Sequence, residues 1–500
     1  PIDIYNNTSE PNRLSAVEDV TLFHFPSLSY NVDKGIVVRA VVKDQDGNCS
    51  DVVSNSYFVG KTAGYYQDMK VISIATESDN LFDPDKGIYV VGTAYYDWWN
   101  NGGKYQNLEA ADSSNPTNYN QHGKEWEIPA SMQVIENGSA VYAANIGIRI
   151  NGNWSRGYKQ KSLRLCARSE YGDSKLRCEM IPGLTDANGN PIDVFDKLVL
   201  HNGGNDLGIL YMRDALLQSL CSDLAFGTNS YEPCIVFIDG EFWGMYTIRE
   251  CIDEDAIASH YHVDKDNVTF IKNWETTGLE SVGAEFDTLC RWGIENDMSV
   301  QENYQKICDA IDMESFMDLI AVETYLNDAD FAPTYLNNYQ LWRVNTPEDG
   351  NPYGDGKWRF FLNDIDMCAN IYGSTETSPS YDLLGNMYTD AEYMNFTGLF
   401  YSLLDNAEFR ETFRLRYLHI IENTFYAEQV STAAEAYSNR CRTAIEDTNS
   451  RFSMSWYNYS YEFSTFLRFF RERPDYARKY LDNLLNKYDR TQNPEQIASS

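Results

Sequence analysis

The 500-residue sequence has few positive charges and few histidines. Lys and Arg total 40 against 74 Asp and Glu, so the formal net charge is -34, and only 6 residues are His. Because binding to nucleic acid depends on clustered Lys and Arg, this composition argues against a nucleic-acid partner. So few scattered histidines also argue against a histidine-based metal centre. The acidic residues are spread along the chain, as is typical of a solvated secreted surface.

Long apolar runs and paired cysteines are also missing. No stretch of eighteen apolar residues occurs, which argues against a membrane-spanning helix. The 10 cysteines form no CxxC pair, so neither a zinc site nor a thioredoxin-type site is expected, and apolar surroundings favour buried free thiols. The chain opens at Pro1 with neither Met nor a signal sequence, as expected of a processed or trimmed fragment.

The length of the chain implies two or three folding units. Residues 1–60 alternate apolar and polar side chains around the turn sequence DQDGN, which predicts a β-hairpin. Strand-like segments continue over residues 61–255, and residues 256–490 are mainly helical in pattern. The polar end, residues 491–500, is expected to be flexible. The predicted fold class is therefore α+β.

The stretch of residues 325–370 carries two groups of acidic and amide side chains. One group follows a helix-like segment and the other a strand-like segment; they comprise Asp328, Asp330, Asn337 and Asn338, and Asp364 and Asp366. Carboxylates and amides at the ends of regular elements are what a magnesium–phosphate site needs. The preceding segment has Met313, Phe316, Met317 and Ile320 on one helical face, so a buried helix is expected to lead into the first group.

A second segment, residues 147–172, is basic and contains several glycines. Ser155, Arg156, Lys159 and Lys161 follow a Gly-rich turn, whose backbone amides could approach phosphates while a Lys on the next strand pairs with them. The segment is neither GxGxxG nor GxxxxGK, so on its own a solvated basic hairpin is the simpler interpretation. Glu250 follows an apolar strand and either orients Lys161, as a Lys–Glu pair does in kinases, or is an exposed charge.

Five blocks, in order between about residues 70 and 420, resemble the spore-coat protein H (CotH) kinase family: GIRINGNWSR..KQKSLRL, LVLHNGGND....YMRDAL, VFIDGEFWGMYTIREC, LNDADF....NNYQLWR and KWRFFLNDID. The resemblance implies an atypical protein-kinase-like fold with a β-rich N-lobe over about residues 61–255 and a helical C-lobe over about residues 256–490. It implies ATP and Mg²⁺ or Mn²⁺ as cofactors. The implied activity is transfer of the γ-phosphate to Ser or Thr hydroxyls of an extracellular protein, by a secreted or cell-surface enzyme.

The resemblance also implies a role for each matching residue. Lys161, with Lys159 as runner-up, would pair with the phosphates, Glu250 would orient Lys161, and Asp330 would be the catalytic base. Further phosphate contacts would come from Arg149, Ser155 and Arg156, and metal ligands from Asp366, Asp364, Asn337 and Asn338, with Asp366 preferred. Residues 1–60 resemble the end of the C-terminal β-sandwich of chitobiases and β-hexosaminidases, which implies a polysaccharide or a multi-enzyme complex as a further partner.

Departures from the family pattern leave two other functions open. Phe331 stands where the family usually has Trp, Asn363 precedes Asp364 in place of Trp, and the segment after Asp330 is a few residues longer. A non-catalytic pseudokinase or scaffold of a polysaccharide-degrading assembly would not be stabilised by ATP and Mg²⁺. A glycoside hydrolase would need two carboxyl groups about 5–10 Å apart and would release sugar without nucleotide.

Overall fold

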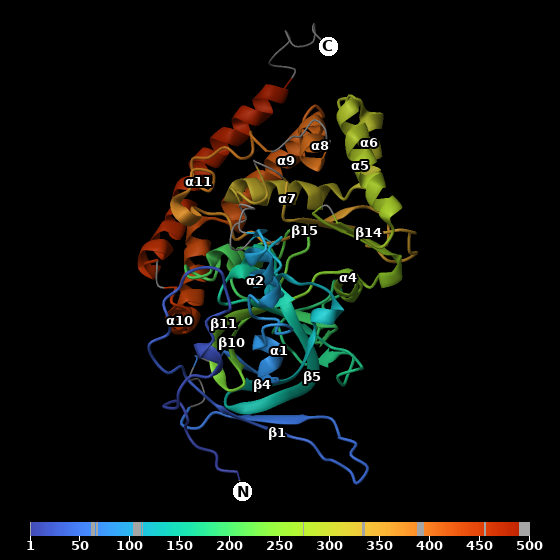
Figure 1. Ribbon diagram of the computed structural model, residues 1–500. Helices are drawn as coiled ribbons and strands as arrows, with labels where there is room; N and C mark the ends of the chain where they lie inside the picture. The colour runs from blue at the N-terminus through green and yellow to red at the C-terminus, as the bar shows by residue number, and fades with distance from the viewer. Residues whose placement is uncertain are drawn as a thin grey trace.

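The computed structural model describes residues 2–61, 66, 69–103, 112, 114–273, 275–332, 336–387, 395–454 and 457–489. Strands dominate up to about residue 250 and helices dominate after it, so the predicted α+β class is confirmed. Figure 1 shows the strand-rich part at the bottom of the view and the long helices above it. The blue N-terminal segment lies at the bottom of this view, and the red end of the last helix lies near the top.

Seven strands close into a barrel in the order β10-β11-β9-β6-β5-β4-β3, because β3 pairs in parallel with β10. The barrel strands are β3 (Lys70–Ala75), β4 (Ile128–Glu136), β5 (Ser139–Asn151), β6 (Ser162–Cys166), β9 (Lys197–His201), β10 (Tyr231–Ile238) and β11 (Glu241–Glu250). Alternate residues such as Ile148, Ile150, Leu163 and Leu165 fill one apolar core. Since neighbours along a strand point to opposite faces, the residues between them lie on the outer face.

A second sheet, in the order β13-β12-β14-β15, supports the helical part. Its strands are β12 (Val268–Lys272), β13 (Glu275–Thr277), β14 (Tyr339–Val344) and β15 (Arg359–Leu362). Two short strands, β7 (Leu176–Arg177) and β8 (Val194–Phe195), pair apart from it. The helices are α1 (Ser78–Phe82), α2 (Thr93–Asn100), α3 (Arg213–Ser219), α4 (Glu254–Tyr261), α5 (Glu280–Glu295), α6 (Gln301–Ala310), α7 (Met313–Leu326), α8 (Phe396–Leu403), α9 (Ala407–His419), α10 (Ala427–Phe452) and α11 (Tyr459–Tyr488).

Helix α7 lies at the centre of the helical part. Asp312 caps its start by accepting a hydrogen bond from the Ser315 amide at 3.0 Å. Every residue from 315 to 326 is buried, so the predicted buried helix is confirmed and is buried on more faces than the one predicted. The helix ends where Asn327 adopts the left-handed conformation (φ 55°), a common way to end a helix. The chain then enters the first acidic group.

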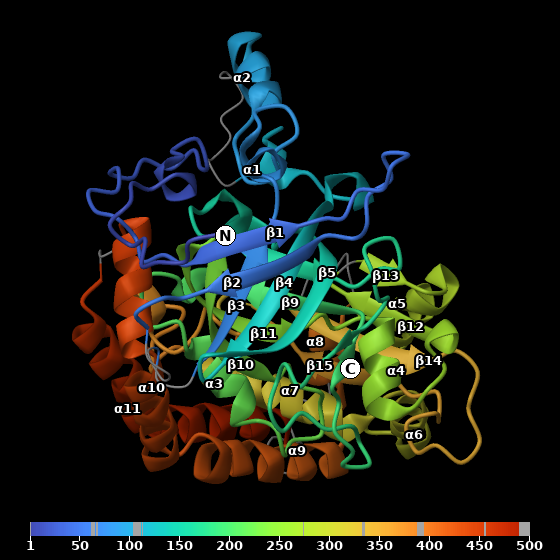
Figure 2. The ribbon, with the colours of Figure 1, turned by 90° about the horizontal axis from the view of Figure 1, so that it is seen from below.

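The N-terminal segment packs onto the barrel. Strands β1 (Ile36–Ala40) and β2 (Val53–Tyr57) form the predicted antiparallel hairpin, and Figure 2 shows this pair crossing the barrel strands. The Ser56 amide donates to Gln133 of β4 at 2.8 Å. Buried residues Leu14 and Val20 belong to the barrel core, and Val32 belongs to the core of the helical part. A domain boundary at residue 60 stays a prediction.

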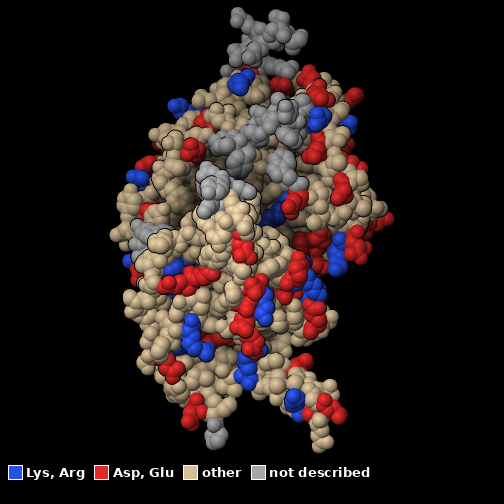
Figure 3. Space-filling view, in the orientation of Figure 1, with Lys and Arg blue, Asp and Glu red and all other residues tan. Residues whose placement is uncertain are grey.

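Two compositional expectations can be compared with the structure. All 10 cysteines are free thiols, and Cys166, Cys221, Cys234, Cys290, Cys368 and Cys441 are buried. None of the helices in the described ranges is both long enough and apolar enough to cross a membrane. Acidic side chains outnumber basic ones over much of the face in Figure 3, in keeping with the net charge.

Candidate active site

The segment after α7 is shaped by one buried carboxylate. Asp328 accepts hydrogen bonds from the backbone amides of Asp330, at 2.8 Å, and Phe331, at 3.3 Å. An Asp side chain that binds amides two and three residues ahead fixes a tight turn. The turn brings the Asp330 carboxylate, which is half-buried, toward the barrel. Phe331, at the position where the family pattern has Trp, is fully buried in the apolar core.

The second acidic group follows β15 directly. Asp364 adopts a left-handed backbone conformation (φ 54°), and its carbonyl accepts a hydrogen bond from Asn338 Nδ2 at 3.2 Å. Asn337 in turn donates to Asn338 Oδ1 at 3.3 Å. The two amides therefore hold the backbone of the acidic segment, and neither donates to the Asp364 carboxylate, whose Oδ1 is buried with no hydrogen-bond partner in the described residues.

Asn205 joins the two acidic groups. It lies in the loop between β9 and α3 and donates to Asp366 through its backbone amide, at 2.7 Å, and through Nδ2, at 2.8 Å. The same Nδ2 lies 3.3 Å from Oδ2 of Asp330. Gly204 makes this approach possible, because a Cβ at that position would collide with the Asp366 carboxylate. The amide group thus stands between two carboxylates that are distant in the sequence.

Burial and mutual repulsion destabilise the charged forms of these carboxylates. Burial, followed by the charge of Asp364, raises the pKa of Asp366 well above its ordinary value. Burial and the charge of Asp214 raise the pKa of Asp364 to about 6. Burial likewise raises the pKa of Asp330, and it raises that of Asp328 further. Crowded carboxylates of this kind are relieved by a cation placed among them.

The residues present fit a divalent cation held partly by phosphate. No three His, Cys, Asp or Glu side chains among the described residues converge closely enough to hold a metal by themselves. Mg²⁺ commonly takes only one or two protein carboxylates and completes its shell with phosphate and water oxygens. Asp366 and Asp330, linked through Asn205, and the unpartnered Oδ1 of Asp364 provide such a set. If its amide turned over, Asn205 would add a carbonyl oxygen.

A buried ion pair ties this segment to the barrel. Asp214 of α3 pairs with Arg249 of β11, and its other oxygen accepts a hydrogen bond from the Ile365 amide at 3.0 Å. Ile365 lies between Asp364 and Asp366. The barrel strand β11 therefore fixes, through one carboxylate, where the acidic segment sits.

Arg249 ends a row of outward-facing residues across four barrel strands. The register places Arg149 opposite Arg164, Arg164 opposite Val199, and Val199 opposite Arg249. Directly paired residues in antiparallel strands share a face. Because Ile148, Leu163 and the other alternating residues fill the barrel, this row lies on the outer face, the face that Arg249 joins to the acidic segment.

Lys272 adds a fourth positive charge. It ends β12 opposite Gln340, whose side chain donates to Asn363, the residue before Asp364, at 2.7 Å. The charges of Arg249 and Lys272 oppose the rise in the Asp364 pKa. Burial raises the pKa of the Cys251 thiol, and the charges of Arg164 and Lys272 oppose it, which places both cations near that thiol. The sheet therefore brings Lys272 beside the acidic segment, and Arg149 and Arg164 lie on the outer barrel face that Arg249 joins to that segment.

Lys161, expected to pair with phosphates, lies inside the mouth of the barrel. Its ammonium donates to the carbonyls of Arg156, at 2.6 Å, and Tyr158, at 2.7 Å, and lies 4.0 Å from the Tyr119 ring centroid. Burial, followed by the charge of Arg156, lowers its pKa well below the ordinary value. The cause is the alternation of side chains along the strand, which puts Lys161 on the same face as the core residues Leu163 and Leu165.

The expected Lys161–Glu250 ion pair is not formed. Glu250 pairs with Leu198 of β9, and Leu198 pairs with Leu165 of β6. Leu165 comes four residues after Lys161, which corresponds to about 13 Å along a strand. Its carboxylate is buried and contacts His260 Nε2 at 2.8 and 3.0 Å. Burial lowers the pKa of His260, but the hydrogen bond and charge of Glu250 outweigh it, so the pKa is raised. Glu250 is therefore not the exposed charge considered from the sequence either.

The other residues expected at the phosphates separate into two groups. Arg149 lies in the cationic row described above. Arg156 is buried and donates to the carbonyls of Gly152, Tyr119, Gln121 and Ile150, so it holds the turn together. Ser155 lies in the same turn, and Lys159 faces residues 25–26, with its ammonium 3.3 Å from the Pro26 carbonyl. The structure brings together Asp330, Asp364, Asp366, Asn337 and Asn338, and it does not bring Lys161, Arg156, Lys159 or Glu250 to them. Arg149 lies in the outward-facing row that ends at Arg249.

Five residues of this site were not singled out from the sequence: Asn205, Asp214, Arg164, Arg249 and Lys272. Arg164 had a usable signal, because alternation in KSLRL puts Lys161 and Arg164 on opposite faces. Asn205 and Asp214 lie in the block HNGGND....YMRDAL, which was matched as a whole without roles for its members. Lys272 had no signal beyond its place at the end of a strand.

Two comparisons bear on this chain. The model of the family described as CotH kinase protein matches residues 148–477. That range contains every residue of the site described above. No curated protein matches the chain.

Proposed function

The chain belongs to the CotH kinase protein family, and on that basis we propose that it is a metal-dependent protein kinase. The reaction is transfer of the γ-phosphate of ATP to Ser or Thr hydroxyls of an extracellular protein. The barrel and the helical part act as the N-lobe and C-lobe of an atypical kinase-like fold. Mg²⁺ or Mn²⁺ is the cofactor, and the enzyme acts outside the cell or at its surface.

One observation carries the proposal: the segment of buried carboxylates is joined, through Asp214, to Arg249, which ends a row of positive charges on the outer face of the barrel. Asp364 and Asp366 are linked to Arg249 through Asp214, and Arg164 lies in the same row. Phosphoryl transfer needs this pairing, because phosphate oxygens require cations on one side and a carboxylate-held metal on the other. A site for a neutral sugar has no use for the cationic row.

The residues divide the work of the reaction. Arg149, Arg164 and Lys272 bind and align the phosphate oxygens. Asp364 and Asp366 would hold the metal, which would supply positive charge beside the phosphates. Asp330 accepts the proton of the attacking hydroxyl. Burial raises its pKa, which makes it a better base near neutral pH than an exposed Asp. Asp214 and Asn338 position the acidic segment through backbone hydrogen bonds.

The second candidate is a pseudokinase or scaffold in a polysaccharide-degrading assembly. Asn205 favours it, because its amide hydrogens occupy the space between Asp330 and Asp366 that a cation would take. A fixed amide there would keep the metal out. The two candidates differ in a single property, the ability of Asn205 to move or turn over when Mg²⁺ arrives.

The test is phosphate transfer from [γ-³²P]ATP to the chain itself and to a mixture of extracellular proteins. Wild-type protein should label Ser or Thr with Mg²⁺ or Mn²⁺ present, and Asp330→Asn should lower the rate by at least about 100-fold, as expected on loss of a general base. Asp309→Asn, an exposed carboxylate on α6, is the matched control and should keep the rate. Labelling that is equal in wild type and Asp330→Asn would contradict the assigned base.

A further inference from the structure

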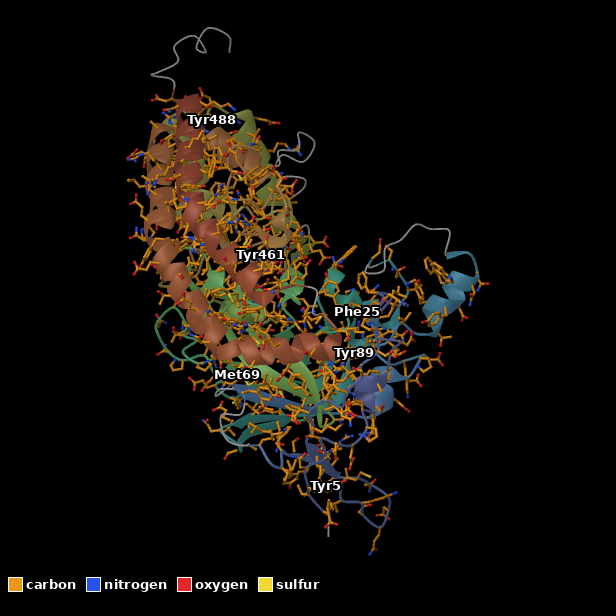
Figure 4. The ribbon with its side chains drawn as sticks, turned by 90° about the vertical axis from the view of Figure 1, so that its left-hand side faces the viewer. Tyr5, Phe25, Met69, Tyr89, Tyr461 and Tyr488 are labelled. Atoms are coloured by element: carbon orange, nitrogen blue, oxygen red, sulfur yellow. The ribbon has the colours of Figure 1, made fainter. Side chains whose placement is uncertain are left out.

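A cavity of about 110 Å³ lies outside the proposed active site, where the N-terminal segment meets the barrel and the end of α10. Ser15 and Leu28 form the N-terminal wall, and Trp243 of β11 forms the barrel wall. Lys159 and Arg451 contribute two positive charges. Figure 4 labels Tyr89, which lines the cavity, and Phe25, whose ring centroid lies 5.0 Å from the Lys159 ammonium.

Arg451 is a buried cation without a counterion. The side chain is 6% exposed, and no hydrogen bond or ion pair joins its guanidinium to any residue that the structure describes. The guanidinium lies 4.7 Å from the Trp243 ring centroid and 4.6 Å from that of Phe452. Such ring contacts offset only part of the hydration that an unpaired charge loses on burial. The charge is therefore left in need of an anion.

Lys159 brings a second positive charge into the same cavity. It is half-buried, and its ammonium donates to the Pro26 carbonyl at 3.3 Å. Lys159 and Arg451 line the same cavity. Burial lowers the pKa of Lys159, repulsion from Arg451 lowers it further, and the charge of Glu18 opposes this. Two cations at one cavity repel each other unless an anion lies between them.

The nearby carboxylates are already engaged. Glu241 contributes to the field at Arg451, but its oxygens accept hydrogen bonds from the amides of Arg13, at 2.6 Å, and Ser15, at 2.7 Å, and from the Ser15 hydroxyl. Glu18 lines the cavity, but it is exposed and accepts from the Ser27 hydroxyl. The charges of Arg451 and Asp447 both act on Tyr30, and neither Tyr30 nor Asp447 lines the cavity. No carboxylate in the described residues forms an ion pair with Arg451.

We propose that this cavity is a binding site for a small oxyanion, a phosphate or carboxylate group, held between Arg451 and Lys159. The planar Arg fork and the Lys point charge are the usual pair for such groups. A water molecule needs roughly 15 Å³ of such volume, so the cavity has room for a group of several heavy atoms. The bound anion links the N-terminal segment to α10. The site is independent of the proposed kinase activity.

The experiment is calorimetric titration of the full chain with inorganic phosphate and, separately, with acetate. Arg164→Met serves as the background for every variant, because it removes a cation from the proposed active site and so weakens phosphate binding there. Saturable binding of either probe should weaken at least tenfold in Lys159→Met and in Arg451→Met. Arg442→Met, an exposed Arg on α10 paired with Glu446, is the control and should bind as the background does. Phosphate binding without acetate binding identifies a phosphate ligand, and the reverse identifies a carboxylate.

Stability gives a second readout that a merely structural Arg would not produce. In anion-free buffer, Arg451→Met should melt at a temperature no lower than the background protein, because an unpaired buried charge is removed. Adding the bound probe should raise the melting temperature of the background protein and leave that of Arg451→Met unchanged. Absence of saturable binding by both probes, or equal binding in the two cavity variants and the background, would overturn the proposal.

Discussion

Replacement of Arg473 by Met should destabilise the protein more than any other single Arg-to-Met change on α11. Arg473 is fully buried and donates five hydrogen bonds, all to the chain around the end of α7. The acceptors are the carbonyls of Thr324, Tyr325, Pro379 and Tyr381 and Oδ1 of Asn327, at 2.7–2.9 Å. The guanidinium thus satisfies the last carbonyls of α7 and lies at the negative end of its dipole.

The magnitude follows from these contacts. Hydrogen bonds from a charged group contribute about 1.5–3 kcal/mol each. Much of the sum is offset, because burying the guanidinium in the folded state costs it its hydration, and Met does not have this cost. Removing one partner of a buried charged network costs about 3–5 kcal/mol, and we expect this loss for Arg473→Met. Because Asn327 precedes the acidic turn, the proposed transfer activity should fall in the folded fraction as well.

Urea unfolding followed by circular dichroism measures the loss, with the slope checked for two-state behaviour. Arg468→Met is the matched control, since Arg468 lies on the same helix, is half exposed and has only a distant Glu472 partner at 3.9 Å. That variant should stay within about 0.5 kcal/mol of wild type. A loss below about 1 kcal/mol in Arg473→Met would refute the conclusion that this residue stabilises the end of α7.

Two further predictions concern the site and the barrel. Asn205→Ala should weaken Mn²⁺ binding by about tenfold or more, whereas Asn205→Asp should retain it. The electron paramagnetic resonance signal of free Mn²⁺ measures the binding. Tighter binding in Asn205→Ala would show that the amide excludes the metal. Burial raises the pKa of Asp239 to about 6 from 3.8. The folded protein therefore holds this proton more tightly than the unfolded chain does. The resulting stabilisation is complete below about pH 4 and is lost as the pH rises to about 6. In wild-type protein the free energy of unfolding in urea should therefore be about 2–3 kcal/mol lower at pH 7 than at pH 4 because of this group, and Asp239→Asn should abolish that difference. An unchanged pH dependence in the variant would contradict the burial of this carboxyl.

Local patterns in the sequence predict what depends on neighbours along the chain. The hairpin around DQDGN, the buried helix before Asn327 and the two acidic groups all follow from periodicity and turn chemistry. The alternation of side chains along the strand puts Lys161 with the barrel core, away from the acidic groups, and the phosphate role that the family resemblance implies for it stays a prediction. The bridging position of Asn205 depends on a contact across 161 residues, which no local pattern encodes. Arg451 and Arg473 look like polar faces of helices in the sequence, and only the packed structure shows that both are buried.

The most direct test of the central claim is titration of the protein with MgATP by calorimetry. We claim that the phosphates lie between the carboxylates at Asp364 and Asp366 and the cationic row that contains Arg164. Wild-type protein should bind MgATP, and Asp366→Asn and Arg164→Met should each raise Kd at least about tenfold, a loss of about 1.4 kcal/mol, with no fall in melting temperature. Wild-type affinity in both variants would contradict the claim.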